Sequence, residues 1–160
     1  MLRIGDPAPQ CDATAVVEGE IVQLGWRRLH EGQTLMLLFE SIDVRNCRCS
    51  FLRALRDAGS EGRRFKLAVV CTNDAIEVSR WMRGLIAERG PGQVGVPVVI
   101  DADNQIASRY GLLTDNGPLQ GHVIVDADGR VRSIAANAFR VGVSVHELAR
   151  SIASIADRGD

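Results

Sequence analysis

The sequence predicts an α/β domain in which helices flank a mixed central β-sheet. Two continuous apolar runs of strand length, residues 34–39 and 66–72, are each followed by apolar positions that recur at helical spacing. Near the C-terminus, an Asp-Gly turn signal at residues 126–129 separates two further strands, which are therefore expected to be antiparallel. Strands that alternate with helices and end in a hairpin indicate one mixed sheet that is covered on both faces.

The chain length of 160 residues predicts a single domain over residues 1–160. Nineteen basic residues against twenty acidic ones give a net charge of −1, so we expect no general attraction to nucleic acid or to anionic membranes. Residues 1–7 lack the apolar segment of a secretory signal, and no apolar run approaches the 18 or so residues that span a bilayer. We therefore expect a cytoplasmic location.

The first predicted strand is residues 34–39 (TLMLLF), a run whose continuous apolar character suits a strand covered on both faces. A helix is predicted after it, because apolar side chains within residues 51–58 recur at helical spacing. Cys47 and Cys49 thus stand where a core strand turns into a helix.

The middle of the chain repeats the same order of elements. Residues 66–72 (KLAVVCT) form the second predicted strand, and Asp74 with its neighbour Asn73 caps a helix. Residues 96–100 form a third strand, and residues 103–110 form a short helix that Gly111 closes.

The predicted chain end consists of a hairpin and one helix. Strands at residues 122–125 and 131–136 flank the Asp-Gly turn, and Ser144 caps the last helix. Its buried stripe is expected to contain Val145, Leu148, Ile152 and Ile155. This order of elements is the thioredoxin arrangement with an N-terminal extension.

Several segments carry a resemblance to a known family. Residues 4–9 (IGDPAP) look like an opening Gly-x-Pro-Ala-Pro, and residues 96–101, 110–113, 122–126 and 137–145 are similar to later signatures in the same order. In these segments the chain resembles the alkyl hydroperoxide reductase/thiol-specific antioxidant family, the peroxiredoxins, and especially its typical 2-Cys branch. The resemblance covers nearly the whole chain and implies the peroxiredoxin type of the thioredoxin-like fold.

The catalytic motif of that family, Pro-x-x-x-Thr-x-x-Cys with a later arginine, is not kept. In an ungapped comparison, its proline, threonine and peroxidatic cysteine positions fall on Ser41, Arg45 and Arg48, and Gln120 replaces the arginine. The family's C-terminal tail, which carries a resolving cysteine, does not follow the last predicted helix. The resemblance therefore implies the fold, but it does not establish peroxidase activity.

The Cys47-Arg48-Cys49-Ser50 segment is nevertheless the predicted catalytic site. A helix start offers unpaired N–H groups and a positive dipole end that stabilise a thiolate, and Arg45 and Arg48 add positive charge. Either cysteine lies one residue from the family's position, so a shift of one residue would present a nucleophile, with Ser50 as its hydroxyl partner.

A second redox chemistry is open to the same pair. One thiolate would attack a target disulfide, and the other would resolve the mixed disulfide. The ring closed by Cys47 and Cys49 is small and strained, which would make the pair an oxidant or isomerase rather than a structural clamp. The resemblance implies reduction of the enzyme by a thioredoxin-like or small-thiol donor.

Other interpretations of the site compete with these. The cysteines could lie in a diverged loop of a catalytically inactive scaffold that serves as a binding or structural module, and the arginines could be a solvated helix face. Metal binding is disfavoured because Cys-x-Cys is not the spacing of most zinc sites. We therefore predict no metal and no cofactor, and we interpret Cys11 and Cys71 as core residues.

The hairpin also predicts an assembly. Family members pair this edge strand across a twofold axis, and residues 133–137 form the matching edge here. We expect a homodimer or a higher homo-oligomer.

Overall fold

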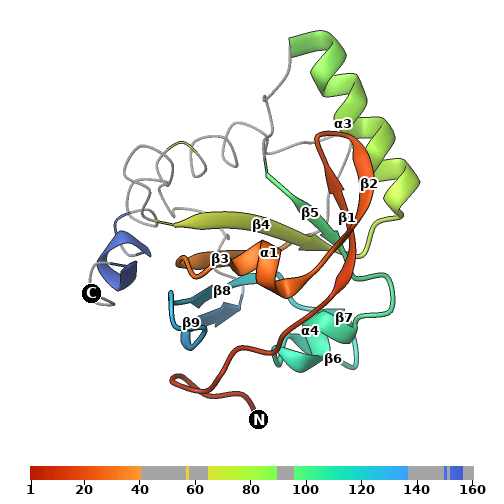
Figure 1. The fold of residues 1–160 in the computed structure, drawn as a ribbon. Coiled ribbons are helices and arrows are strands. Elements are labelled where there is room, and N and C mark those ends of the chain that lie inside the picture. The colour runs from red at the N-terminus through yellow and green to blue at the C-terminus, as the bar shows by residue number, and fades with distance from the viewer. Residues whose placement is uncertain (41–56, 58–64, 90–95, 137–149, 151, 157–160) are drawn as a thin grey trace.

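The computed structural model describes residues 1–40, 57, 65–89, 96–136, 150 and 152–156 (Figure 1). Its centre is a seven-stranded sheet of order β2-β1-β5-β4-β3-β8-β9, accompanied by a two-stranded sheet, β6-β7. The strands are β1 (Ala13–Val17), β2 (Glu20–Leu24), β3 (Leu35–Phe39), β4 (Lys66–Cys71), β5 (Val98–Ile100), β6 (Leu113–Thr114), β7 (Gly117–Pro118), β8 (Gly121–Val125) and β9 (Val131–Ala136). The helices are α1 (Trp26–His30), α3 (Ala75–Arg89) and α4 (Gln105–Arg109).

The three central strands are parallel, and the strands outside them are antiparallel. β4 pairs in parallel with β3 and β5, whereas β8 pairs antiparallel with β3 and β1 pairs antiparallel with β5. Every residue of β3 and β8 is buried, and five of the six residues of β4 are buried. The continuous apolar runs thus correspond to strands covered on both faces, which confirms the predicted mixed α/β sheet.

Two hydrophobic clusters form the core, one on each face of the sheet. Alternate side chains of a strand point to opposite faces, so Leu37 joins one cluster and Leu38 the other. α1 and α4 cover the first face, where Leu29 and Ile106 are buried. α3 covers the second face, together with the helical residues 152–156. Figure 1 shows α3 beside the β1–β2 hairpin.

The capping prediction for α3 is confirmed. The Asp74 carboxylate accepts hydrogen bonds from the N–H groups of Ile76 and Glu77, at 2.9 and 3.3 Å. These are donors that a helix start leaves without an intrahelical partner. The short helix α4 is likewise followed by Gly111 with φ +73°, the left-handed conformation that glycine adopts without a steric penalty.

The β8–β9 hairpin has the predicted turn, and a buried carboxylate organises it. Asp126 accepts hydrogen bonds from the N–H groups of Asp128 and Arg130 at 3.0 and 2.9 Å, and its second oxygen pairs with the Arg132 guanidinium. Burial alone would raise the pKa of Asp126, but these donors outweigh burial and hold the pKa below its usual value. The carbonyl of Asp126 also lies 2.7 Å from Nε2 of the buried His30.

The main difference between the structure and the prediction is the segment from residue 13 to residue 30, whose elements were not predicted. It forms the β1–β2 hairpin and α1, which the sequence pattern did not reveal. The hairpin turns at Glu18 and Gly19, with φ +52° and +81°, and the usual Asn-Gly or Asp-Gly signal is absent there. α1 has five residues, too few to show a helical period.

The predicted helix over residues 51–58 lies outside the described residues except for residue 57, and so do the Ser144 cap of the last helix and its stripe residues Val145 and Leu148. Of the predicted stripe on that last helix, Ile152 is fully buried and Ile155 packs against the same cluster. Within the described part of the chain, no helix is long and apolar enough to cross a membrane.

Candidate active site

A small cavity lies where the three parallel strands end, at their C-terminal edge. In open α/β sheets, ligands bind at this edge. The cavity has a volume of about 30 Å³. It is lined by Phe39, Glu40, Val70, Cys71, Thr72, Asp101, Ala107, Pro118, Leu119 and Gln120.

The acidic groups of this cavity are held by the fold. The Asp101 carboxylate accepts hydrogen bonds from the N–H groups of Ile106 and Ala107, both at 2.9 Å, so it anchors the start of α4. The backbone N–H of Glu40 donates to the Val70 carbonyl at 3.1 Å, which continues the β3–β4 pairing by one residue. Asp101 is therefore an anchor for α4 rather than a proton acceptor for a substrate.

Cys71 contributes to the cavity wall, but it is not an activated thiol. The residue is 3% exposed. Burial raises the pKa of Cys71 to about 11, so the thiol is protonated at neutral pH. A thiolate, not a thiol, is the nucleophile in peroxide and disulfide chemistry.

Cys11 is equally unsuited to that chemistry. It is 8% exposed, and burial raises the pKa of its thiol although the Arg109 guanidinium lies nearby. Its Sγ lies 3.5 Å from the Pro9 carbonyl, which also accepts a hydrogen bond from the Tyr110 hydroxyl at 2.8 Å. Both cysteines are core residues, as the sequence predicted.

Gln120 and His122 lie at the start of the segment that pairs with β3 on its other side, and of the two only Gln120 is among the described cavity residues. Gln120 precedes β8 and lines the cavity, so the position compared above with the family's arginine does reach this site. His122 lies opposite Leu38 of β3 and is 8% exposed. Burial lowers the pKa of His122, which leaves the imidazole neutral at pH 7.

The predicted catalytic residues Arg45, Cys47, Arg48, Cys49 and Ser50 lie outside the described residues. Their segment follows Glu40 directly in the sequence, and Glu40 lines the cavity. The described residue that precedes this segment in the sequence therefore borders the cavity. Within that part, no group of three or more His, Cys, Asp or Glu side chains could hold a metal ion.

Sequence reasoning did not identify the cavity, because its walls come from four separate segments. Pro118 ends β7, Leu119 lies between β7 and β8, and Ala107 lies in α4. One signal was available: parallel strands that end at a common edge bring their following residues together. That rule would have selected Glu40, Thr72 and Asp101.

Comparison with known proteins gives one family. The model of the AhpC/TSA family matches residues 4–134. The chain is 29% identical to peroxiredoxin prdx-2 of Caenorhabditis elegans over 153 residues, which cover 93% of this chain and 76% of the relative. It is 31% identical to peroxiredoxin-4 of Bos taurus over 154 residues, which cover 94% of this chain and 56% of the bovine protein.

Solved structures give the same fold. AhpC of Enterococcus faecalis superposes with a TM-score of 0.80 at 19% identity, over 100% of this chain and 98% of that one. The reduced 2-Cys peroxiredoxin of Plasmodium vivax superposes with a TM-score of 0.79 at 24% identity, over 98% of each chain. These similarities establish the thioredoxin-like fold with its mixed sheet flanked by helices.

Proposed function

Because the chain belongs to the AhpC/TSA family, we propose that it is a peroxiredoxin-like thiol oxidoreductase that uses Cys47 and Cys49. Its peroxiredoxin relatives support a thiol-dependent peroxidase. We choose Cys47 and Cys49 because the remaining cysteines are unsuitable: Cys11 and Cys71 are buried, and burial raises the pKa of both thiols. Cys47 and Cys49 are then the remaining candidates for the nucleophile.

The proposed reaction consumes one peroxide and two thiols. The thiolate of one cysteine attacks a peroxide oxygen, the O–O bond breaks, and a sulfenic acid forms while the second oxygen leaves as hydroxide and takes up a proton to become water. The thiol of the other cysteine then attacks the sulfenic sulfur, which gives the Cys47–Cys49 disulfide and a second water. A thioredoxin-like dithiol or a small thiol reduces that disulfide and is itself oxidised.

The cavity at the ends of β3, β4 and β5 supports a small substrate. About 10–15 Å³ is enough for one water-sized molecule. The volume of about 30 Å³ thus has room for two such spheres, the size of hydrogen peroxide. Gln120 at its wall offers an amide N–H to a peroxide oxygen, but it brings no positive charge.

The test is a thiol titration of the reduced protein before and after one equivalent of hydrogen peroxide. Stopped-flow kinetics would follow the reaction, and mass spectrometry would map the product. We expect two thiols to disappear faster than the thiol of free cysteine reacts, with a Cys47–Cys49 link. Cys47→Ser and Cys49→Ser should each abolish that product, whereas Cys11→Ala, a variant of a buried cysteine outside the described lining of the small cavity, should retain it.

Two outcomes would reject the peroxidase. Thiol loss no faster than that of an ordinary exposed cysteine would reject peroxidase activity. Thiol loss in the two serine variants as fast as in the wild type would reject it too. Under the first outcome, reduction of a small disulfide by the protein would be measured next. Exchange that depends on Cys47 and Cys49 would then assign thiol-disulfide chemistry to the pair.

A catalytically inactive scaffold is the second candidate, and one observation favours it. Ser41, Arg45 and Gln120 replace three residues that act on peroxide together in the family, and Gln120 lines the cavity. A protein of this kind would show neither fast peroxide reduction nor disulfide exchange. The thiol titration therefore separates the two candidates.

We also propose a cytoplasmic location. We further propose that the chain forms a homodimer through β9. β9 is the last strand of the described sheet, and its outer edge has no neighbouring strand there. Edge strands of this kind readily pair with a second copy. Membership of the AhpC/TSA family supports the thioredoxin-like or small-thiol reductant that the sequence resemblance implied.

A further inference from the structure

A second and larger cavity lies at the opposite end of the sheet from the candidate active site. Its volume is about 280 Å³, and Lys66 at the start of β4 lines it. Cys71 at the end of β4 lines the small cavity instead. The two residues are roughly 17 Å apart along the strand at about 3.3 Å per residue. The larger cavity is therefore separate from the proposed redox site.

The shortness of α1 explains why this cavity exists. α1 covers one face of the sheet, but it has only five residues and is followed by Glu31 in a left-handed conformation, φ +50°. Among the described helices, α1 alone contributes residues to the lining of this cavity. Val17 and Val22 of the β1–β2 hairpin and Pro97 before β5 form the remaining apolar wall.

The floor of the cavity is part of the hydrophobic core. Leu24 and Leu29, which are 9% and 6% exposed, line it and belong to the cluster on this face. The same two leucines line a void of about 10 Å³ on the core side, which Trp26 also lines. Such a void holds no more than one water, and it gives the leucine side chains room to adjust.

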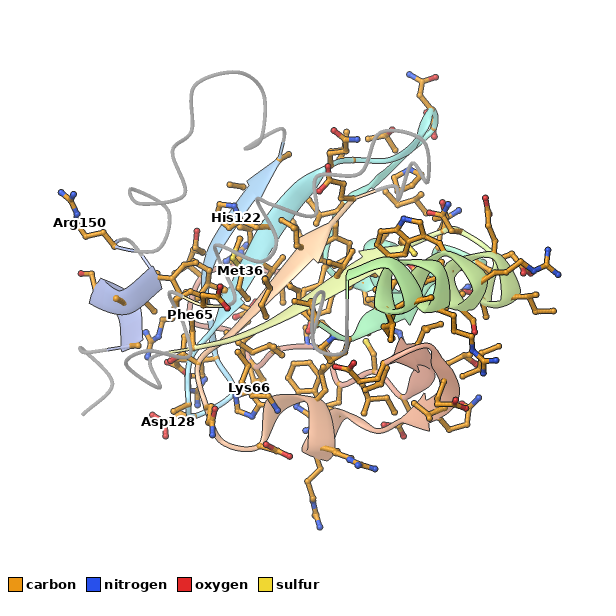
Figure 2. All side chains as sticks on the ribbon, turned by 90° about the horizontal axis from the view of Figure 1, so that it is seen from above. Met36, Phe65, Lys66, His122, Asp128 and Arg150 are labelled. Carbon is orange, nitrogen blue, oxygen red and sulfur yellow. The ribbon has the colours of Figure 1, made fainter. Side chains whose placement is uncertain are left out.

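Charged side chains stand at the mouth of this apolar cavity. Lys66 Nζ donates hydrogen bonds to the Arg28 carbonyl at 3.2 Å and to the Glu31 carboxylate at 3.1 Å, so Glu31 neutralises it. Figure 2 shows Lys66 beside α1. The exposed Arg28 guanidinium makes no ion pair with any residue of the described ranges. Among the described lining residues, Arg28 is therefore the positive charge without a compensating carboxylate.

We propose that this cavity binds a medium-chain fatty acid or an equally small apolar carboxylate. Arg28 would pair with the carboxylate, and the hydrocarbon would contact Leu24, Leu29 and Val22. Guanidinium–carboxylate pairs are strong and directional, and an apolar floor favours methylenes over polar groups. The volume lies just below the range of drug-sized ligand sites, which favours a medium chain over larger lipids. The proposal does not depend on the cysteines.

Calorimetric titration of the reduced full-length protein with octanoate tests the proposal. We expect octanoate to bind, and hexanoate to bind roughly tenfold more weakly because it loses two buried methylenes. Octanol should bind about tenfold more weakly than octanoate, and octylamine should show no binding because its charge opposes that of Arg28. Trp26 lines the small void next to Leu24 and Leu29, so we expect its indole fluorescence to change when octanoate binds. A Trp81→Phe background isolates this signal.

Matched variants assign the site. Arg28→Gln should weaken octanoate binding about tenfold, whereas Arg27→Gln, on the same helix but outside the cavity lining, should leave it unchanged. Val22→Trp should fill the cavity and abolish binding in a protein whose circular dichroism matches that of the wild type. Equal losses in the two arginine variants, or equal affinity for octanol and octanoate, would overturn the proposal. Absence of octanoate binding at millimolar concentration would do the same.

Discussion

At the scale of single residues, the described part of the chain contains two buried carboxylates that the fold uses for structure. Asp101 anchors α4 through two backbone N–H groups, and Asp126 holds the β8–β9 turn. Each follows a core strand, a position at which an aspartate could be interpreted as a catalytic carboxylate. Asp101 bonds to backbone N–H groups, and Asp126 bonds to backbone N–H groups and to the Arg132 guanidinium, so the chemistry of the candidate site rests on thiols and on the charge around them.

Gln120→Arg tests the electrostatics of the candidate site. A guanidinium at the cavity wall should lower the pKa of a nearby thiol and raise the rate of thiol loss with hydrogen peroxide about tenfold at pH 7. Gln33→Arg is the matched control, because Gln33 is exposed and precedes β3 at the opposite end from the cavity. An equal effect of the two substitutions would show that position 120 does not act on the reacting thiol.

Asp126→Asn tests the buried turn carboxylate. The pKa of Asp126 is lower in the folded protein than in the unfolded chain, so its stabilising effect is complete above about pH 4 and is lost as the pH falls through the folded value. We expect the variant to lose about 2 kcal/mol of unfolding free energy at pH 7, and the difference from wild type to shrink below pH 4. Urea unfolding between pH 3 and pH 7 measures it.

Asp128→Asn is the control for that series, since the residue is exposed in the same turn. Its unfolding free energy should follow the wild type at every pH. A difference between wild type and Asp126→Asn that stays constant down to pH 3 would contradict the role given to the Asp126 charge.

At the scale of elements, the central strands and the last hairpin were predictable, and the N-terminal hairpin was not. β3 and β4 are continuous apolar runs, and the turn before β9 ends in an Asp-Gly pair, so local sequence alone indicates them. The β1–β2 turn places Glu18 at positive φ, which is costly for a residue with a side chain and carries no sequence signal. That hairpin is held by tertiary contacts: the Gly19 carbonyl accepts hydrogen bonds from Ser79 and Arg83 of α3.

A pair of glycine variants tests the packing of the β8–β9 element. A methyl group at Gly121 would lie 2.1 Å from the Ala135 carbonyl oxygen on β9. Gly121→Ala should therefore destabilise the protein by about 2 kcal/mol or more. Gly84→Ala is the control, because its added methyl would meet no atom within 4 Å. It should stabilise α3 by about 0.5–1 kcal/mol, and urea unfolding would detect both signs.

At the scale of the whole molecule, the two cavities lie at opposite ends of the sheet, and the sequence alone did not predict this placement. The candidate redox site lies at the C-terminal edge of the parallel strands, and the larger cavity lies at their start. The cysteine motif predicted a redox site from the sequence, although it did not reveal the small cavity and the motif itself lies outside the described residues. The second depends on where a five-residue helix stops above the sheet, and no local pattern encodes that distance.

The edge strand leads to a prediction about assembly. We expect sedimentation velocity to give a dimer of twice the chain mass of 17.4 kDa. Ala136 is exposed at the end of β9, and Ala136→Glu should place like charges close together where two copies pair and shift the protein toward monomer. Ile76→Glu, an exposed substitution on α3, should leave the dimer intact. A wild-type monomer would contradict the proposed assembly.

The chain contains a single lysine, Lys66, and the fold places it beside the larger cavity. Its ammonium group is engaged by a carbonyl and a carboxylate, and its side chain is 28% exposed. Lysine-directed reagents therefore have one target in this sequence, and the acylation rate of Lys66 provides a built-in chemical probe of the α1 end of the molecule.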